Sequence, residues 1–107
     1  MTMKTIKVAE ATERQLDWLV ARIEGDEWPK DGGKGLDYST DWACGGPIIE
    51  RELIDVLHVR QNDLSVAWGA AFGDEVVESG PTFLIAAMRC YATSKLGMEA
   101  EVPEELT

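Results

Sequence analysis

The sequence predicts an α+β fold in which two main helices pack on a small antiparallel sheet, beside a long ordered loop that contains glycine and tryptophan. Two observations predict this class. Apolar residues recur at helical spacing in residues 13–24 and after Gly80, whereas residues 54–59 and 64–72 have the β-branched or alternating character of strands. The length of 107 residues predicts one domain, 1–107, whose acidic end, 99–107, we expect to be loosely held.

The first helix has clear boundaries. Residues 3–9 before it suit a short strand or an extended lead-in. Thr12 and Gln15 have the spacing of a capping box, in which each side chain accepts a hydrogen bond from the other's backbone N–H. Gly25 is a natural stop. We therefore expect a helix over 13–24.

Residues 25–47 are rich in glycine, contain Pro29 and Pro47, and show no periodicity, so they predict a loop. A disordered linker is poor in aromatic residues, yet this segment carries Trp28, Tyr38 and Trp42. We expect at least 38–47 to be ordered and packed. Pro47 suits the first position of a short helical turn.

The second half predicts strands followed by a helix. Turn signals at 61–63 and 73–75 separate strands at 54–59 and 64–72 from a short third strand that begins at Val76. The second helix is expected to start at Pro81 and to stop at Gly97. Its residues are apolar on nearly every face, which is typical of a central, buried helix.

Charge and composition exclude several classes of function. The net charge of −10 opposes direct binding to nucleic acid, and it leaves open solubility alone or imitation of nucleic acid. No apolar run approaches the roughly 20 residues of a membrane span, and the first residues do not resemble a signal peptide, so we expect a cytoplasmic protein. With one histidine and two distant cysteines, Cys44 and Cys90, we expect reduced thiols and no metal or cofactor.

Two long segments carry a resemblance to a known family. They are YSTDWACGGPIIERE at 38–52 and GPTFLIAAMRCYATSKLG at 80–97, and the ending EVPEEL at 101–106 fits as well. Together with the first helix they resemble the NinX-like family of small tailed-bacteriophage and prophage proteins. The resemblance implies a phage or prophage origin and synthesis in the cytoplasm of a bacterial host. It implies no activity and no catalytic residues, because the family has no established biochemical function.

The candidate ligand-binding residues are Tyr38, Asp41, Trp42, Arg51 and Arg89. Stacking aromatic rings and convergent polar groups on an ordered loop are what a small-ligand pocket needs. The alternative is structural: Asp41 caps a turn and Trp42 fills the core.

Arg89 interrupts an apolar helix, so it needs a partner. The expected partner is a carboxylate at Asp41, Glu50 or Glu52, or else an anionic ligand.

Three further positions have simple interpretations. Trp28 is the candidate protein interface, because an exposed tryptophan is often an energetic anchor. His58 is expected to be a packed or edge residue of its strand rather than a catalyst. Asp17 and Glu24 lie seven residues apart on the first helix and are expected to face solvent.

The leading functional hypothesis is a non-catalytic binding module that acts on a host factor, in host takeover or in blocking antiviral defence. The alternative is a small-molecule binder, or sponge, for an anionic nucleotide-like ligand. An enzyme ranks last, because no catalytic motif is recognisable. The apolar second helix suits either a core position or a dimer seam, and a homodimer is weakly favoured.

Overall fold

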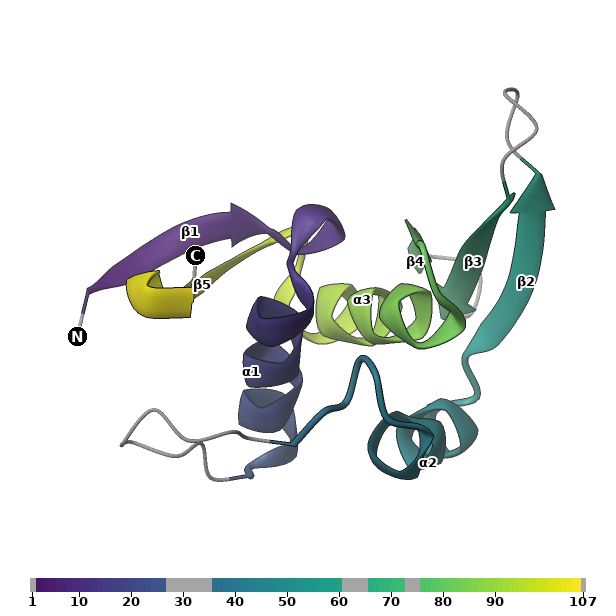
Figure 1. Cartoon of the computed structure of the whole chain (residues 1–107), viewed down its shortest axis with the longest axis horizontal. Coiled ribbons are helices and arrows are strands. Elements are labelled where there is room, and N and C mark those ends of the chain that lie inside the picture. The colour runs from purple at the N-terminus through teal and green to yellow at the C-terminus, as the bar shows by residue number, and fades with distance from the viewer. Residues whose placement is uncertain (1, 27–35, 61–65, 73–75, 107) are drawn as a thin grey trace.

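The computed structural model describes residues 2–26, 36–60, 66–72 and 76–106 (Figure 1). Over these residues the chain forms three α helices and two antiparallel sheets, so the fold is α+β. In order, the elements are β1 (Met3–Lys7), a 3₁₀ helix (Val8–Glu10), α1 (Glu13–Glu24), α2 (Trp42–Glu52), β2 (Asp55–Arg60), β3 (Val66–Phe72), β4 (Val76–Gly80), α3 (Phe83–Leu96), β5 (Glu99–Pro103) and a second 3₁₀ helix (Glu104–Leu106).

Helix α1 begins and ends where the sequence predicted. The Thr12 hydroxyl accepts a hydrogen bond from the Gln15 backbone N–H at 3.2 Å, and the Gln15 side chain accepts one from the Thr12 N–H at 3.0 Å. Gly25 ends the helix at a φ of 77°, a left-handed conformation that glycine adopts without steric cost. Leu16 and Leu19 are fully buried on the inner face.

Helix α2 corrects the predicted loop. It begins at Trp42, with Asp41 as its N-cap, so Pro47 lies inside the helix rather than at its start. Glycine and proline both lower helix propensity, and Pro47 has no N–H to donate to the carbonyl four residues earlier. Packing overrides these preferences. A Cβ at Gly45 would overlap the Tyr38 carbonyl oxygen and lie 2.8 Å from Leu84 Cδ2, so the helix passes close to both groups.

Helix α3 is the central element of the fold, as Figure 1 shows. Its N-cap is Thr82, whose hydroxyl accepts a hydrogen bond from the Ile85 N–H at 3.2 Å; Pro81 therefore precedes the cap instead of opening the helix as predicted. Gly97 follows its last residue, as expected. The predicted burial is confirmed, since eight of its residues are buried: Leu84, Ile85, Ala86, Ala87, Met88, Cys90, Tyr91 and Ala92.

The strands form two sheets rather than the one predicted. Strands β2, β3 and β4 pair in that order, all antiparallel, and α3 packs against β3 and β4. The predicted strands at 54–59, 64–72 and from Val76 correspond to these three. His58 lies on the edge strand β2, opposite Trp68 in the register.

The C-terminal segment is more firmly held than expected. Strand β5 pairs antiparallel with β1 along its whole length, from Met3 opposite Pro103 to Lys7 opposite Glu99. Val102 is fully buried as part of the main core, where β5 contacts α1, and Leu106 is 8% exposed. The backbone of β5 is held by its pairing with β1, which the acidic composition of 99–107 does not reveal.

Candidate functional site

The Tyr38–Thr40 turn leads into α2 and places its first aromatic ring in the core. The Asp37 carbonyl accepts hydrogen bonds from the N–H groups of Thr40 and Asp41, at 3.3 and 2.8 Å. Tyr38 is 4% exposed, and its carbonyl lies beneath Gly45. Its ring therefore packs in the interior and offers no surface for stacking on a ligand.

A buried carboxylate on α1 anchors this turn. Asp17 Oδ1 accepts hydrogen bonds from the Ser39 backbone N–H at 2.8 Å and from the Ser39 hydroxyl at 2.7 Å. Asp17 is 6% exposed, which corrects the expectation that it faces solvent. Burial raises the pKa of Asp17 above its usual value, and the two Ser39 hydrogen bonds oppose that shift.

The start of α2 brings Asp41 and Trp42 to the surface. Asp41 Oδ1 accepts a hydrogen bond from the Ala43 N–H at 2.9 Å, so this carboxylate caps the helix, as the structural alternative predicted. Trp42 does not fill the core, because it is 55% exposed. Its ring rests on Phe83, with 4.8 Å between centroids and 47° between planes. Trp42 belongs to α2 and Phe83 to α3, so the two helices fix the position of the ring pair.

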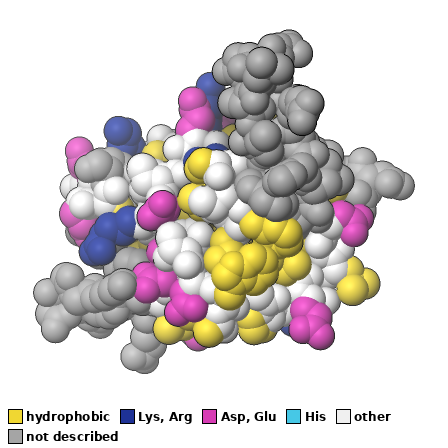
Figure 2. All heavy atoms as spheres, turned by 45° about the vertical axis from the view of Figure 1, so that its right-hand side comes forward, with side chains coloured by type: hydrophobic (Ala, Val, Ile, Leu, Met, Phe, Trp, Pro, Cys, Tyr) yellow, Lys and Arg dark blue, Asp and Glu magenta, His cyan; other side chains and the backbone are white. Residues whose placement is uncertain are grey.

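An open hollow surrounds this aromatic pair. Its volume is about 410 Å³, and it is lined by the Ser39–Thr40 turn, by Trp42, and by four residues that lead into α3 and begin it: Pro81, Thr82, Phe83 and Leu84. Figure 2 turns the α2 side of the molecule forward and shows hydrophobic side chains gathered into a patch on this face. We call Trp42, Phe83 and Pro81 the aromatic patch.

Arg51 lies at the centre of a network that joins the three helices. Its Nη1 and Nη2 donate to the two carboxylate oxygens of Glu24, each at 2.9 Å. Its Nε donates to Glu52 at 2.8 Å, and its Nη2 also lies 3.0 Å from the Tyr91 hydroxyl oxygen. The Tyr91 hydroxyl donates to Glu24 at 2.5 Å. The Arg51 guanidinium is therefore engaged by its own chain on every nitrogen.

The network shifts the titration of its members. The hydrogen bond from Arg51 lowers the pKa of Glu24, and the Tyr91 hydroxyl adds to this effect. Burial and the hydrogen bond to Glu24 raise the pKa of Tyr91 to about 12. Glu24 is therefore an ion-pair partner rather than the solvated residue predicted. The arrangement explains how α2 is held against α1 and α3.

Arg89 has backbone partners, which corrects the predicted ion pair. Its Nη1 donates to the Ser79 carbonyl and its Nη2 to the Ala11 carbonyl, both at 3.0 Å. Neither Asp41, Glu50 nor Glu52 contacts it through any hydrogen bond or salt bridge between described residues. Its Nε is buried without a hydrogen-bond partner in the described part of the chain, and burial lowers the pKa of the guanidinium. Arg89 ties β4 and the segment before α1 to α3.

The predicted site residues do not converge. Arg89 lies two positions before Tyr91 on α3, about 200° around the helix axis. Since Arg51 meets the Tyr91 face, the two arginines lie on opposite sides of α3. Asp41 and Trp42 lie at the N-terminal end of α2, away from both arginines. Trp28 lies outside the described residues, and its role as an interface remains a prediction.

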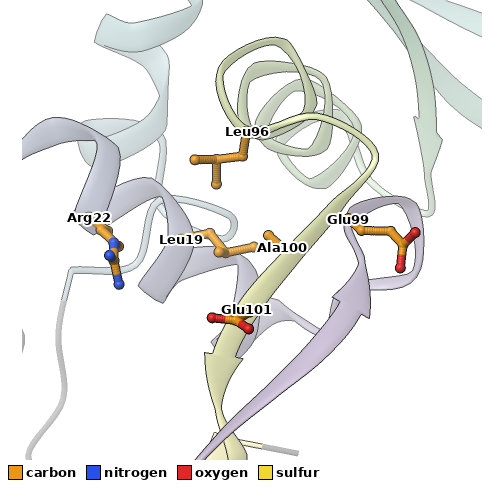
Figure 3. A pocket seen from close by; sticks show the side chains of 6 residues that line it. All are labelled: Leu19, Arg22, Leu96, Glu99, Ala100 and Glu101. Atoms are coloured by element: carbon orange, nitrogen blue, oxygen red, sulfur yellow. The ribbon is translucent and has the colours of Figure 1, made fainter.

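A second hollow, of about 320 Å³, lies between α1, the end of α3 and β5. Figure 3 shows Leu19, Leu96 and Ala100 pointing toward one another, while Glu99 points away. Arg22 at its rim also lies over the Trp18 ring, 5.4 Å from the centroid. The hollow is therefore lined by charged side chains, Arg22, Glu99 and Glu101, as much as by apolar ones, unlike a predominantly apolar ligand pocket.

Two further features concern the residues that the structure describes. No three or more His, Cys, Asp and Glu side chains gather there in a way that could hold a metal ion. None of the described helices is both long and apolar enough to cross a membrane. Neither cysteine forms a disulfide: Cys90 is buried, and Cys44 is half-buried on α2.

The fold and its surfaces define a small α+β protein in which Arg51 and Arg89 are engaged by groups of the same chain and the aromatic patch is open. The family described as Bacteriophage P22, NinX matches residues 7–95, so the chain belongs to this bacteriophage family. The match spans α1 to α3 and includes the aromatic patch. It confirms the resemblance drawn from the sequence. No curated protein matches the chain.

Proposed function

We propose that the chain is a non-catalytic binding module that engages a host protein in the bacterial cytoplasm during phage infection, with the aromatic patch as its contact surface. Host takeover and blocking of antiviral defence are the two settings in which a phage protein would act in this way. The observation that carries the proposal is the exposure of Trp42, 55%, on a ring that is nevertheless held in place by Phe83.

An exposed, immobilised tryptophan suits a protein contact for a physical reason. Tryptophan is enriched among the residues that contribute most to binding, because it buries a large area and has little side-chain entropy to lose. Phe83 lies at the start of α3 and Trp42 at the start of α2, so the two rings move with the body of the fold. The hollow beside them, lined by Ser39, Thr40 and Thr82, can accept a protruding side chain of the partner.

The small-molecule alternative has less support. It used Arg51 and Arg89 to hold an anion, yet the first donates to Glu24, Glu52 and Tyr91 and the second to two carbonyls. An anion would have to displace these partners. A ligand in the hollow beside Trp42 would be held instead by rings and hydroxyls. Native mass spectrometry of gently purified protein separates the two functions, since such a ligand adds a few hundred daltons that denaturation removes.

The proposal is tested by photo-cross-linking in bacteria that express the protein. A photoreactive amino acid replaces Thr40, which is exposed and lines the hollow, so that Trp42 itself stays intact. The matched control places the same group at Met98, which is 78% exposed. Met98 follows the C-terminal end of α3, whereas Phe83 of the aromatic patch lies at the N-terminal end. We expect one host polypeptide joined at position 40, none at 98, and loss of the product when Trp42→Ala is added.

The same experiment defines the results that would contradict the proposal. Identical products at positions 40 and 98 would indicate unspecific capture. A product that survives Trp42→Ala would remove the aromatic patch from the interface. A product of twice the chain mass would show a second copy as the occupant, which is the homodimer that the sequence weakly favoured.

A further inference from the structure

In the described part of the chain, positively charged side chains lie near the rings of Trp18 and Tyr91 but not near that of Trp42. Arg22 lies over Trp18, 5.4 Å from its centroid, and Arg51 and Lys95 each lie 5.9 Å from the centroid of Tyr91. Among the described residues no cation lies over Trp42, although indole is the ring that attracts cations most strongly. Phe83 covers part of the Trp42 ring and leaves the rest open to solvent.

The charge around Trp42 favours a cation. Asp41 directly precedes it and is exposed. The residues that line the hollow include no lysine or arginine. Figure 2 shows acidic side chains beside the hydrophobic patch on this face. The whole chain carries a net charge of −10, so its field attracts positive groups over a longer range.

We infer that Trp42 receives an arginine or lysine side chain of a basic protein partner, whose positive group lies over the open part of the indole ring beside Asp41. The inference rests on the proposed function and adds the chemistry of the partner's contact residue. Apolar contact with Phe83 and Pro81 accommodates the methylene stem of that side chain, and the carboxylate of Asp41 completes the charge balance.

This arrangement repeats a contact that the chain already makes internally. Arg22 and Trp18 lie four residues apart on α1, so their cation–π contact is local. The residues three and four positions after Trp42 on α2 are Gly45 and Gly46, which have no side chain, so this helix supplies no cation to Trp42 in the way that Arg22 serves Trp18. The partner therefore provides from outside what Arg22 provides to Trp18.

The test uses a defined cationic peptide in place of the partner. Fluorescein-labelled acetyl-tetraarginine amide is titrated with the full chain at low salt, and binding is followed by fluorescence anisotropy. The neutral comparison is the tetracitrulline peptide, which has the same shape without charge. Trp42→Leu removes the ring from an exposed position, and Met98→Leu is the matched control at another exposed apolar residue. Circular dichroism confirms that each variant is folded.

We expect wild-type protein to bind tetraarginine about two- to fivefold more tightly than Trp42→Leu does, the ratio of an exposed cation–π contact. Met98→Leu should bind as wild type, and tetracitrulline should bind far more weakly to all three proteins. Equal affinities of wild type and Trp42→Leu, equal affinities for the two peptides, or no measurable binding of tetraarginine by wild type would each overturn the inference.

The outcome is separable from that of the proposed function. A host polypeptide cross-linked at position 40, combined with no preference for tetraarginine, would leave the interface standing and remove the cationic contact. A Trp42-dependent preference for tetraarginine without any cross-linked polypeptide would establish the chemistry of the ring and remove the host-protein function.

Discussion

Substitution of the two neighbouring glycines of α2 by alanine gives opposite predictions. A Cβ at Gly45 would overlap the Tyr38 carbonyl oxygen and lie 2.8 Å from Leu84 Cδ2, whereas a Cβ at Gly46 would lie 3.5 Å from Trp42 Cε3, an ordinary contact. Both substitutions raise helix propensity by about 1 kcal/mol. Only the one at position 45 adds overpacking, which costs about 1–3 kcal/mol in a tightly packed region.

The propensity gain cancels when the two variants are compared. We therefore expect Gly46→Ala to unfold at a higher urea concentration than wild type, and Gly45→Ala to be less stable than Gly46→Ala by about 1–3 kcal/mol. The assay is urea denaturation followed by circular dichroism at constant pH, and it requires equal m-values in the two variants.

Two outcomes would contradict this description of α2. If both alanines stabilise the protein equally, Gly45 does not lie as close to the Tyr38 carbonyl and Leu84 as the structure places it. If both destabilise it equally, α2 does not extend through the Gly-Gly pair.

Two further predictions concern buried polar groups. In the wild-type protein, the pKa of Asp17 is raised in the folded state. The contribution of this carboxyl group to stability is therefore fully present below its unfolded-state pKa and is lost as the pH rises through its folded-state pKa. The Asp17→Asn variant lacks this pH-dependent contribution. The unfolding free energy of the variant minus that of wild type should thus increase from pH 3 to pH 7, and a difference independent of pH would contradict the burial of this carboxylate. For Arg89→Met, two hydrogen bonds to the Ser79 and Ala11 carbonyls are lost, and a fall in stability of about 1–3 kcal/mol is expected in urea denaturation. An unchanged midpoint would show that Arg89 is free for another role.

The two helices with clear end signals were predictable from sequence. The Thr12–Gln15 capping box and Gly25 define α1, and the apolar run before Gly97 defines α3, because in both cases local preference and packing agree. Helix α2 was not predictable in the same way. Gly45, Gly46 and Pro47 all oppose a helix locally, and the contacts with Tyr38 and Leu84 that favour it come from distant parts of the chain.

The candidate site was predictable only in part. The sequence identified Trp42 and Asp41 but could not determine that the ring is exposed, since an indole packs equally well in a core. Asp17 was missed, although a signal existed in the sequence: Val20 and Ala21, three and four residues later on the same helix face, are both apolar. Its partner Ser39 lies 22 positions away, and no local pattern connects them.

The partners of Arg89 also could not be predicted from local sequence. Arg89 was expected to meet a carboxylate, because a charge in an apolar helix needs compensation. Two backbone carbonyls provide it instead, and their positions depend on how β4 and the segment before α1 meet α3. Carbonyl oxygens carry no sequence signature, so this solution is visible only in the fold.

The central claim, that Trp42 is the surface through which the chain meets its partner, is tested most directly by hydroxyl-radical footprinting. Oxidation of Trp42 is measured by mass spectrometry in the purified protein and again in lysate of the bacterial host, with the exposed Met98 as the internal reference. The account predicts ready oxidation of Trp42 in the purified protein and strong protection in lysate, while Met98 is oxidised equally in both. Equal oxidation of Trp42 in the two conditions would contradict it.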